Sequence, residues 1–192
     1  MTADTIATYN LSEVRFNNIS FVALPPREGT NAKIFVLQEN DNNSRVHFLI
    51  SGTVKNISSS QYGTNYSFLP KTCDGQAIRD LVQEFENRSP YVDVATPEFK
   101  NHLSIKVPYP EMVDQVKPPF DATLLIQATF YYNDEKKKAG LSLKLIDIVS
   151  YEITIDPALR VVKSGLLTVE GGVRIDDGVK AKPSIIERVE KF

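Results

Sequence analysis

Most of the chain alternates hydrophobic and polar residues with the two-residue period of β-strands. The segment 45–55, RVHFLISGTVK, alternates in this way from Val46 to Val54. The segment 33–39, KIFVLQE, is rich in β-branched and aromatic residues, and the residues between the two, 40–44, are the turn formers NDNNS. This pattern predicts a β-hairpin.

A second hairpin is predicted further along the chain. The segment 122–132, ATLLIQATFYY, alternates strictly, and the segment 140–150 begins with the alternating run GLSLKL. The two are separated by the charged tip NDEKKK at 133–138. Because Ile146 and Ile148 break the alternation of the second strand, we expect a bulge there or burial on both faces.

One segment has the period of an amphipathic helix. Residues 74–87, DGQAIRDLVQEFEN, repeat hydrophobic side chains at intervals of three and four residues. Asp74 is a suitable N-cap, and Pro90 follows the end of the segment. The pattern predicts a helix over 75–87.

The order of these elements predicts a mainly β protein, an OB-fold-like Greek-key β-barrel with one amphipathic helix (75–87) and extra strands. Residues 1–150 would form the barrel with an additional N-terminal strand, and residues 88–121 would be an insertion. Residues 151–192 would be a C-terminal extension that packs on the barrel or serves oligomer or partner contacts. The five barrel strands are expected at 33–39, 45–55, 65–69, 122–132 and 140–150.

Composition removes several classes of function. The chain has 192 residues, 22 lysines and arginines and 24 aspartates and glutamates, so its formal charge of −2 provides no general attraction to nucleic acid. Two histidines and one cysteine cannot form a Cys/His zinc site or an internal disulfide. We expect no bound metal and no cofactor.

The sequence also lacks the motifs of common enzymes and of targeting signals. It contains no G-x-S-x-G, no phosphate-binding GxxxxGK[ST] and no GxGxxG, so we expect a protein without catalytic activity. It has no basic start followed by an apolar stretch and no run of about 18 apolar residues. These absences predict an intracellular protein that is neither secreted nor bound to a membrane.

The segment 129–149, TFYYNDEKKKAGLSLKLIDIV, is an aromatic strand that runs through a charged tip into a Gly-Leu-rich strand. In this respect the chain resembles the single-stranded DNA-binding proteins of phages and large DNA viruses, which are OB-folds with family-specific insertions. Members of that family often end in an aromatic residue, as this chain does at Phe192. The resemblance implies coating of single-stranded DNA in replication or recombination, with replication proteins as partners of the C-terminus.

Such binding requires cations along the phosphate path and flat side chains on which bases stack. The candidate cations lie on the outer faces of the predicted strands or at the second hairpin tip. The candidate stacking residues are tyrosines in or beside strands. The predicted nucleic-acid-binding residues are Arg45, Lys55, Tyr62, Tyr66, Tyr131, Lys136, Lys137, Lys138 and Lys144, and Phe192 is the predicted partner-binding residue.

A second hypothesis is a viral capsid or tail protein, a β-sandwich whose strands and polar loops serve assembly. A lysine run at a hairpin tip is often a solvated turn that protects an edge, and tyrosines are common in strands for packing reasons. The helix between two hairpins favours the barrel, whereas the acidic charge balance favours the sandwich. A homo-oligomer is compatible with either hypothesis.

Overall fold

The computed structural model describes residues 5–109, 111, 116–153 and 180–181. Most of these residues lie in strands, so the prediction of a mainly β protein is confirmed. The elements are β1 (Ile6–Asn10), β2 (Ile19–Ala23), β3 (Ala32–Glu39), β4 (Arg45–Ser60), β5 (Gly63–Pro70), α1 (Thr72–Arg88), β6 (Glu98–Phe99), β7 (His102–Val107), β8 (Phe120–Asn133), β9 (Lys138–Ile153) and β10 (Lys180–Ala181).

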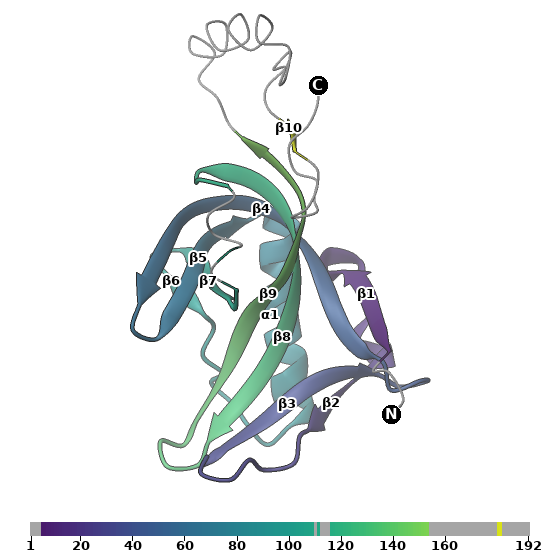
Figure 1. Cartoon of the computed structure of the whole chain (residues 1–192). Helices are drawn as coiled ribbons and strands as arrows, with labels where there is room; N and C mark the ends of the chain where they lie inside the picture. The colour runs from purple at the N-terminus through teal and green to yellow at the C-terminus, as the bar shows by residue number, and fades with distance from the viewer. Residues whose placement is uncertain (1–4, 110, 112–115, 154–179, 182–192) are drawn as a thin grey trace, which may run out of the picture.

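Five strands close into a ring. Along the ring, β4 pairs with β5, β5 with β7, β7 with β9, β9 with β8, and β8 again with β4. Every pairing is antiparallel except that of β7 with β9. The strands β1, β2 and β3 extend the sheet from β4 and β8 on one side of this ring (Figure 1).

The first hairpin of the ring is not the predicted one. The predicted hairpin partners, β3 and β4, share a single pair, Gln38 with Arg45, and β3 instead pairs with β2 and β8. The ring hairpin is formed by β4 and β5, because β4 continues through the polar stretch NISSS to Ser60. Its hydrophobic alternation ends at Val54, where a bulge between Val54 and Asn56 shifts the register.

The segment 88–121, predicted to be an insertion, contributes the ring strand β7. The side chains of Leu103, Ile105 and Val107 alternate along β7 and are buried in the core. The strand expected at 33–39 is therefore replaced in the ring by β7, and the strands near 45–55 and 65–69 become its first and second members. β7 has only six residues and lies in a proline-rich connection. Its hydrophobic alternation therefore does not indicate that it would pair within the ring.

The predicted helix is confirmed as α1, which starts three residues earlier, at Thr72. Asp74 lies inside the first turn and does not cap the helix. Its buried carboxylate accepts a hydrogen bond from the Ser51 backbone N–H at 2.8 Å and so ties α1 to β4. At the other end, the Phe85 ring stacks on Phe130 of β8 with centroids 4.1 Å apart.

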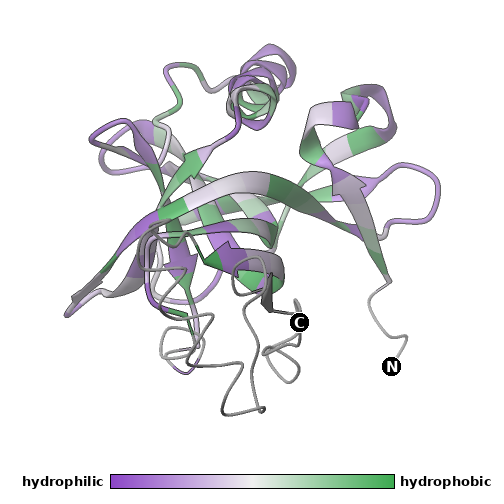
Figure 2. Cartoon of the chain, turned by 90° about the horizontal axis from the view of Figure 1, so that it is seen from above, coloured by the Kyte–Doolittle hydropathy of each residue, from purple (hydrophilic) through white to green (hydrophobic). Residues whose placement is uncertain are grey.

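The core lies between the inner face of the ring strands and α1. Its largest fully buried side chains include Phe48, Phe68, Phe120 and Phe130 from the ring strands, together with Phe85 from α1. Buried and more exposed positions alternate along β7 and β8, and Figure 2 shows hydrophobic and hydrophilic segments along the strands. The outer face of the ring is consequently the polar surface on which ligand contacts can form.

β4 changes partners around Gly52, which is opposite Pro70 of β5 on one side and Ala122 of β8 on the other. A Cβ atom at Gly52 would lie 2.2 Å from the Leu69 carbonyl oxygen and 2.8 Å from Cζ of Phe68. Because the nearest of these atoms is backbone, no side-chain rotation would relieve the clash. The close approach of the end of β5 to β4 therefore requires glycine at this position.

Replacement of Gly52 by alanine is expected to lower the free energy of unfolding by about 1–3 kcal/mol, the usual cost of overpacking a dense site. Urea denaturation followed by far-UV circular dichroism measures the change. Gly75→Ala in α1 is the control, since its added Cβ would meet only Pro70 Cγ at 3.5 Å and alanine favours the helix. Equal stability of Gly52→Ala and the native protein would contradict the requirement for glycine at this position.

Candidate nucleic-acid interface

A row of polar side chains crosses the outer face of four ring strands. Lys106 of β7 is opposite Lys144 of β9 in parallel register, and both side chains are exposed. Asn65 of β5 is opposite Lys106, and Gln127 of β8 is opposite Lys144. We call these four residues, Asn65, Lys106, Lys144 and Gln127, the cross-strand row.

The two lysines of the cross-strand row place like charges on neighbouring strands. Among the described residues, no carboxylate forms an ion pair with Lys106 or Lys144. Like charges directly opposite each other destabilise a sheet. An anion that contacts both ammonium groups would remove this repulsion, so the row is a favourable position for a phosphate group.

His47 lies next to the cross-strand row on β4. Phe48 is opposite Ile126, which brings His47 to the level of Gln127. The imidazole is buried, and burial lowers the pKa of His47 below its ordinary value; the positive charges of Arg45 and Lys144 lower it further. His47 is therefore uncharged at neutral pH. Lys144 of β9 is close enough to His47 of β4 for its charge to lower the pKa of the imidazole.

The lysines at the tip of the β8–β9 hairpin point into solvent. Lys136, Lys137 and Lys138 are all exposed. The acidic residues of the tip are bound toward β3: Asp134 forms an ion pair with Lys33 at 3.6 Å, and Glu135 accepts a hydrogen bond from Asn31. The two carboxylates of the tip thus have partners at β3, whereas the three lysines extend into solvent.

Exposed tyrosines lie at the opposite ends of this face. Tyr62 forms the tip between β4 and β5 and is 89% exposed. Tyr109 is the second residue after β7 and is 55% exposed. Because Val107 is opposite Thr64, Tyr109 lies at the same end of the sheet as Tyr62. Tyr131 of β8 is 38% exposed and lies toward the lysine tip.

Tyr131 borders a hollow of about 180 Å³ beside the cross-strand row. Lys106 and Asn65 of the row line this hollow, together with the hydroxyl groups of Ser104 and Ser142. An aromatic ring, a cation and hydroxyl groups therefore meet in one place on the outer face.

The prediction that Tyr66 stacks on a base is wrong. Tyr66 is fully buried, and its ring makes an edge contact with Phe120 at 6.1 Å between centroids. Tyr66 and Phe68 are two residues apart on β5 and share its inner face, whereas Asn65 and Ser67 point outward.

Two other predicted residues lie away from the cross-strand row. Lys55 is exposed at the β4 bulge, and its neighbour Val54 is opposite Phe120, at the far end of β8 from Gln127. Arg45 begins β4 on the same strand as His47, and it is opposite Ile6 of β1 and Gln38 of β3. Lys144, Tyr131 and the three tip lysines therefore lie along the β8–β9 hairpin, and Tyr62 lies at the other edge of the face. Phe192 lies outside the described residues.

Lys106 and Tyr109 were missed by reasoning from sequence. The alternation of the segment 102–107, HLSIKV, makes Lys106 an outward residue, which is a usable signal. Its position opposite Lys144 depends on the parallel pairing of β7 and β9, which no local pattern shows. Tyr109 stands between two prolines, a context that favours an extended connection and does not indicate exposure.

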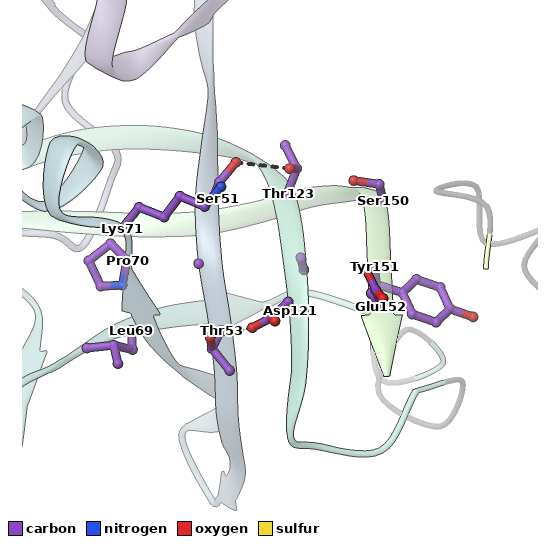
Figure 3. A pocket seen from close by; sticks show the side chains of 12 residues that line it. Ser51, Thr53, Leu69, Pro70, Lys71, Asp121, Thr123, Ser150, Tyr151 and Glu152 are labelled. Atoms are coloured by element: carbon purple, nitrogen blue, oxygen red, sulfur yellow. Dashed lines mark hydrogen bonds between the residues drawn. The ribbon is translucent and has the colours of Figure 1, made fainter. Parts of the chain in front are cut away.

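A larger groove of about 660 Å³ opens at the far end of the β8–β9 hairpin (Figure 3). The Ser51 and Thr123 hydroxyl groups are hydrogen-bonded there at 3.0 Å, and the Thr53 hydroxyl donates to Asp121 Oδ1 at 2.5 Å. Asp121 and Glu152 both line the groove and are opposite one another on neighbouring strands. This end of the outer face is unfavourable for phosphate.

No protein-family model, curated protein or solved structure matches the chain. Within the described part of the chain, no group of three or more His, Cys, Asp or Glu side chains is arranged to hold a metal ion. No helix among the described residues is long and apolar enough to cross a bilayer.

The lowered pKa of His47 predicts a loss of stability in mild acid. The unfolded chain takes up a proton near pH 6.5, whereas the folded protein takes it up only at lower pH, so the free energy of unfolding falls as pH drops below about 6.5. Above that pH, His47 contributes no pH dependence. Urea denaturation at pH 7.5 and at pH 5.5 should show a smaller loss for His47→Gln than for the native protein, and equal losses would contradict the assignment.

Proposed function

We propose that this protein binds single-stranded DNA without strong sequence preference and coats exposed strands during replication or recombination, without catalysis. The observation that carries the proposal is the like-charge pair of Lys106 and Lys144, which no described carboxylate neutralises. The pair lies between two hairpin tips that carry exposed tyrosine and lysine side chains.

The ring supports the proposal through its strand order. An OB-fold is a five-stranded Greek-key barrel that binds oligonucleotides on the face of its second and third strands and with the loops of its two hairpins. In the ring, β5 and β7 take the second and third places, and the hairpin loops are the tips at Tyr62 and at Lys136–Lys138. The cross-strand row begins on these two strands.

In this proposal the strand crosses β5, β7, β9 and β8 between the two tips. Lys106, Lys144 and the tip lysines neutralise phosphates, while exposed tyrosines offer flat surfaces to the bases. Stacking of this kind contributes about 1–3 kcal/mol per base and is tolerant of sequence. Duplex DNA has its base faces stacked on one another, so it would use the lysines alone and bind more weakly.

The replacement of both row lysines, Lys106→Ala with Lys144→Ala, is expected to weaken binding of a fluorescein-labelled oligo-dT. For a single strand, the slope of log K against log salt should fall by about 0.7 for each phosphate that is no longer neutralised. Fluorescence anisotropy at several salt concentrations measures both quantities, with a duplex of equal length as comparison. Arg79→Ala is the matched control, because Arg79 is an exposed cation of α1 and is not on the outer face of the ring strands. Equal effects of the control and the double variant would refute the proposed path.

Reversal of the tip charges tests the second part of the path. The triple variant Lys136→Glu, Lys137→Glu and Lys138→Glu should weaken binding by at least tenfold at low salt and flatten its salt dependence, because three exposed cations become anions. Since the side chains are solvated, the thermal unfolding curve should change little. Unchanged affinity would remove the β8–β9 tip from the interface.

A further inference from the structure

The ring of Tyr131 extends over the strand next to its own. Tyr131 of β8 is opposite Gly140 of β9. A Cβ atom built on Gly140 would lie 2.3 Å from the Tyr131 hydroxyl oxygen and 2.4 Å from its Cζ atom. The end of the tyrosine ring thus occupies the space that a side chain at position 140 would need, and glycine is required for this position of the ring.

The segment 95–97 also lines the neighbouring hollow. Ala95 is bridged to Gly140: its N–H donates to the Ala139 carbonyl oxygen at 3.0 Å, and its carbonyl oxygen accepts from the Leu141 N–H at 2.8 Å. Pro97 is held against β7, because its carbonyl oxygen accepts a hydrogen bond from the Ser104 N–H at 2.6 Å. The hydrogen-bonded backbone of the segment 95–97 and the Tyr131 ring therefore both border the hollow.

The chemistry of the hollow suits one nucleotide. The Tyr131 ring is partly exposed and offers a surface for stacking. The hydroxyl groups of Ser104 and Ser142 can each donate or accept a hydrogen bond, so they can contact the edge of any base. Lys106 lines the same hollow and supplies a cation for the adjoining phosphate.

We infer that Tyr131 and this hollow form a subsite for a single nucleobase of the bound strand, with Gly140 as the positioning residue that lets the ring lie over β9. The inference rests on the proposed function and deepens it, since it assigns one stacking position within the path. It also gives Tyr131 a different role from the tip lysines, because stacking on the tyrosine contributes affinity that does not depend on salt.

The test compares Gly140→Ala and Tyr131→Leu with the native protein in oligo-dT anisotropy titrations. Each variant should weaken binding by about 5- to 150-fold, the reduction that corresponds to one stacked base. The slope of log K against log salt should remain that of the native protein, because every cation is retained. The double variant should bind no more weakly than Tyr131→Leu alone, since both changes remove the same stacking interaction.

Gly75→Ala is the matched control. It adds a methyl group in α1 without a close contact, so it should bind like the native protein. Circular dichroism and thermal unfolding verify that each variant is folded. Native affinity of Gly140→Ala together with weak binding of Tyr131→Leu would overturn the role of Gly140, and native affinity of both would overturn the subsite.

Photocrosslinking of the native protein to an oligonucleotide that contains 5-bromodeoxyuridine provides a test that needs no variant. Peptide mapping should find Tyr131 among the crosslinked residues. If native protein binds oligo-dT and no crosslink includes Tyr131, the subsite is wrong while the proposed function stands. If native protein does not bind oligo-dT at low salt, the proposed function fails and the subsite fails with it.

Discussion

The close approach of the end of β5 to β4 at Gly52 is the constraint on which the ring depends. At this residue β4 is paired on both sides, with Pro70 and with Ala122, and the Leu69 carbonyl oxygen occupies the space of a side chain. The neighbouring Ser51 N–H donates to buried Asp74, which fixes the start of α1 at the same point. Because β4 is paired with both β5 and β8 at this position, it joins the two sides of the ring.

The pairing of the ring strands also places basic and acidic side chains at different ends of the outer face. The pair of Lys106 and Lys144 lies toward the β8–β9 tip, whereas Asp121 and Glu152 are opposite one another at the far end of the same hairpin. A protein with a formal charge of −2 thereby acquires a locally basic surface. The local arrangement, and not the net charge, decides whether an anion can bind, because exposed charges more than about 8 Å apart are largely screened at physiological salt.

The elements that could be predicted from the sequence are those whose patterns involve only neighbouring residues. The second hairpin and α1 were predicted closely, because strict alternation and the helical period are both properties of neighbouring residues. The β4–β5 hairpin was missed, since the bulge after Val54 interrupts the alternation and polar residues follow it. Tyr66 was predicted to stack on a base, although its spacing of two residues from Phe68 places both side chains on the inner face of β5, in the core.

The sequence by itself determined the mainly β class, the helix, the charged β8–β9 tip and the residues available for binding. The tertiary structure alone decided which strands are neighbours, and therefore that Lys106 lies opposite Lys144 and that the Tyr131 ring lies over Gly140. The physical reason is that a side-chain period reports the face of a strand on which a residue lies, whereas strand pairing depends on hydrogen bonds and packing between segments far apart in the chain.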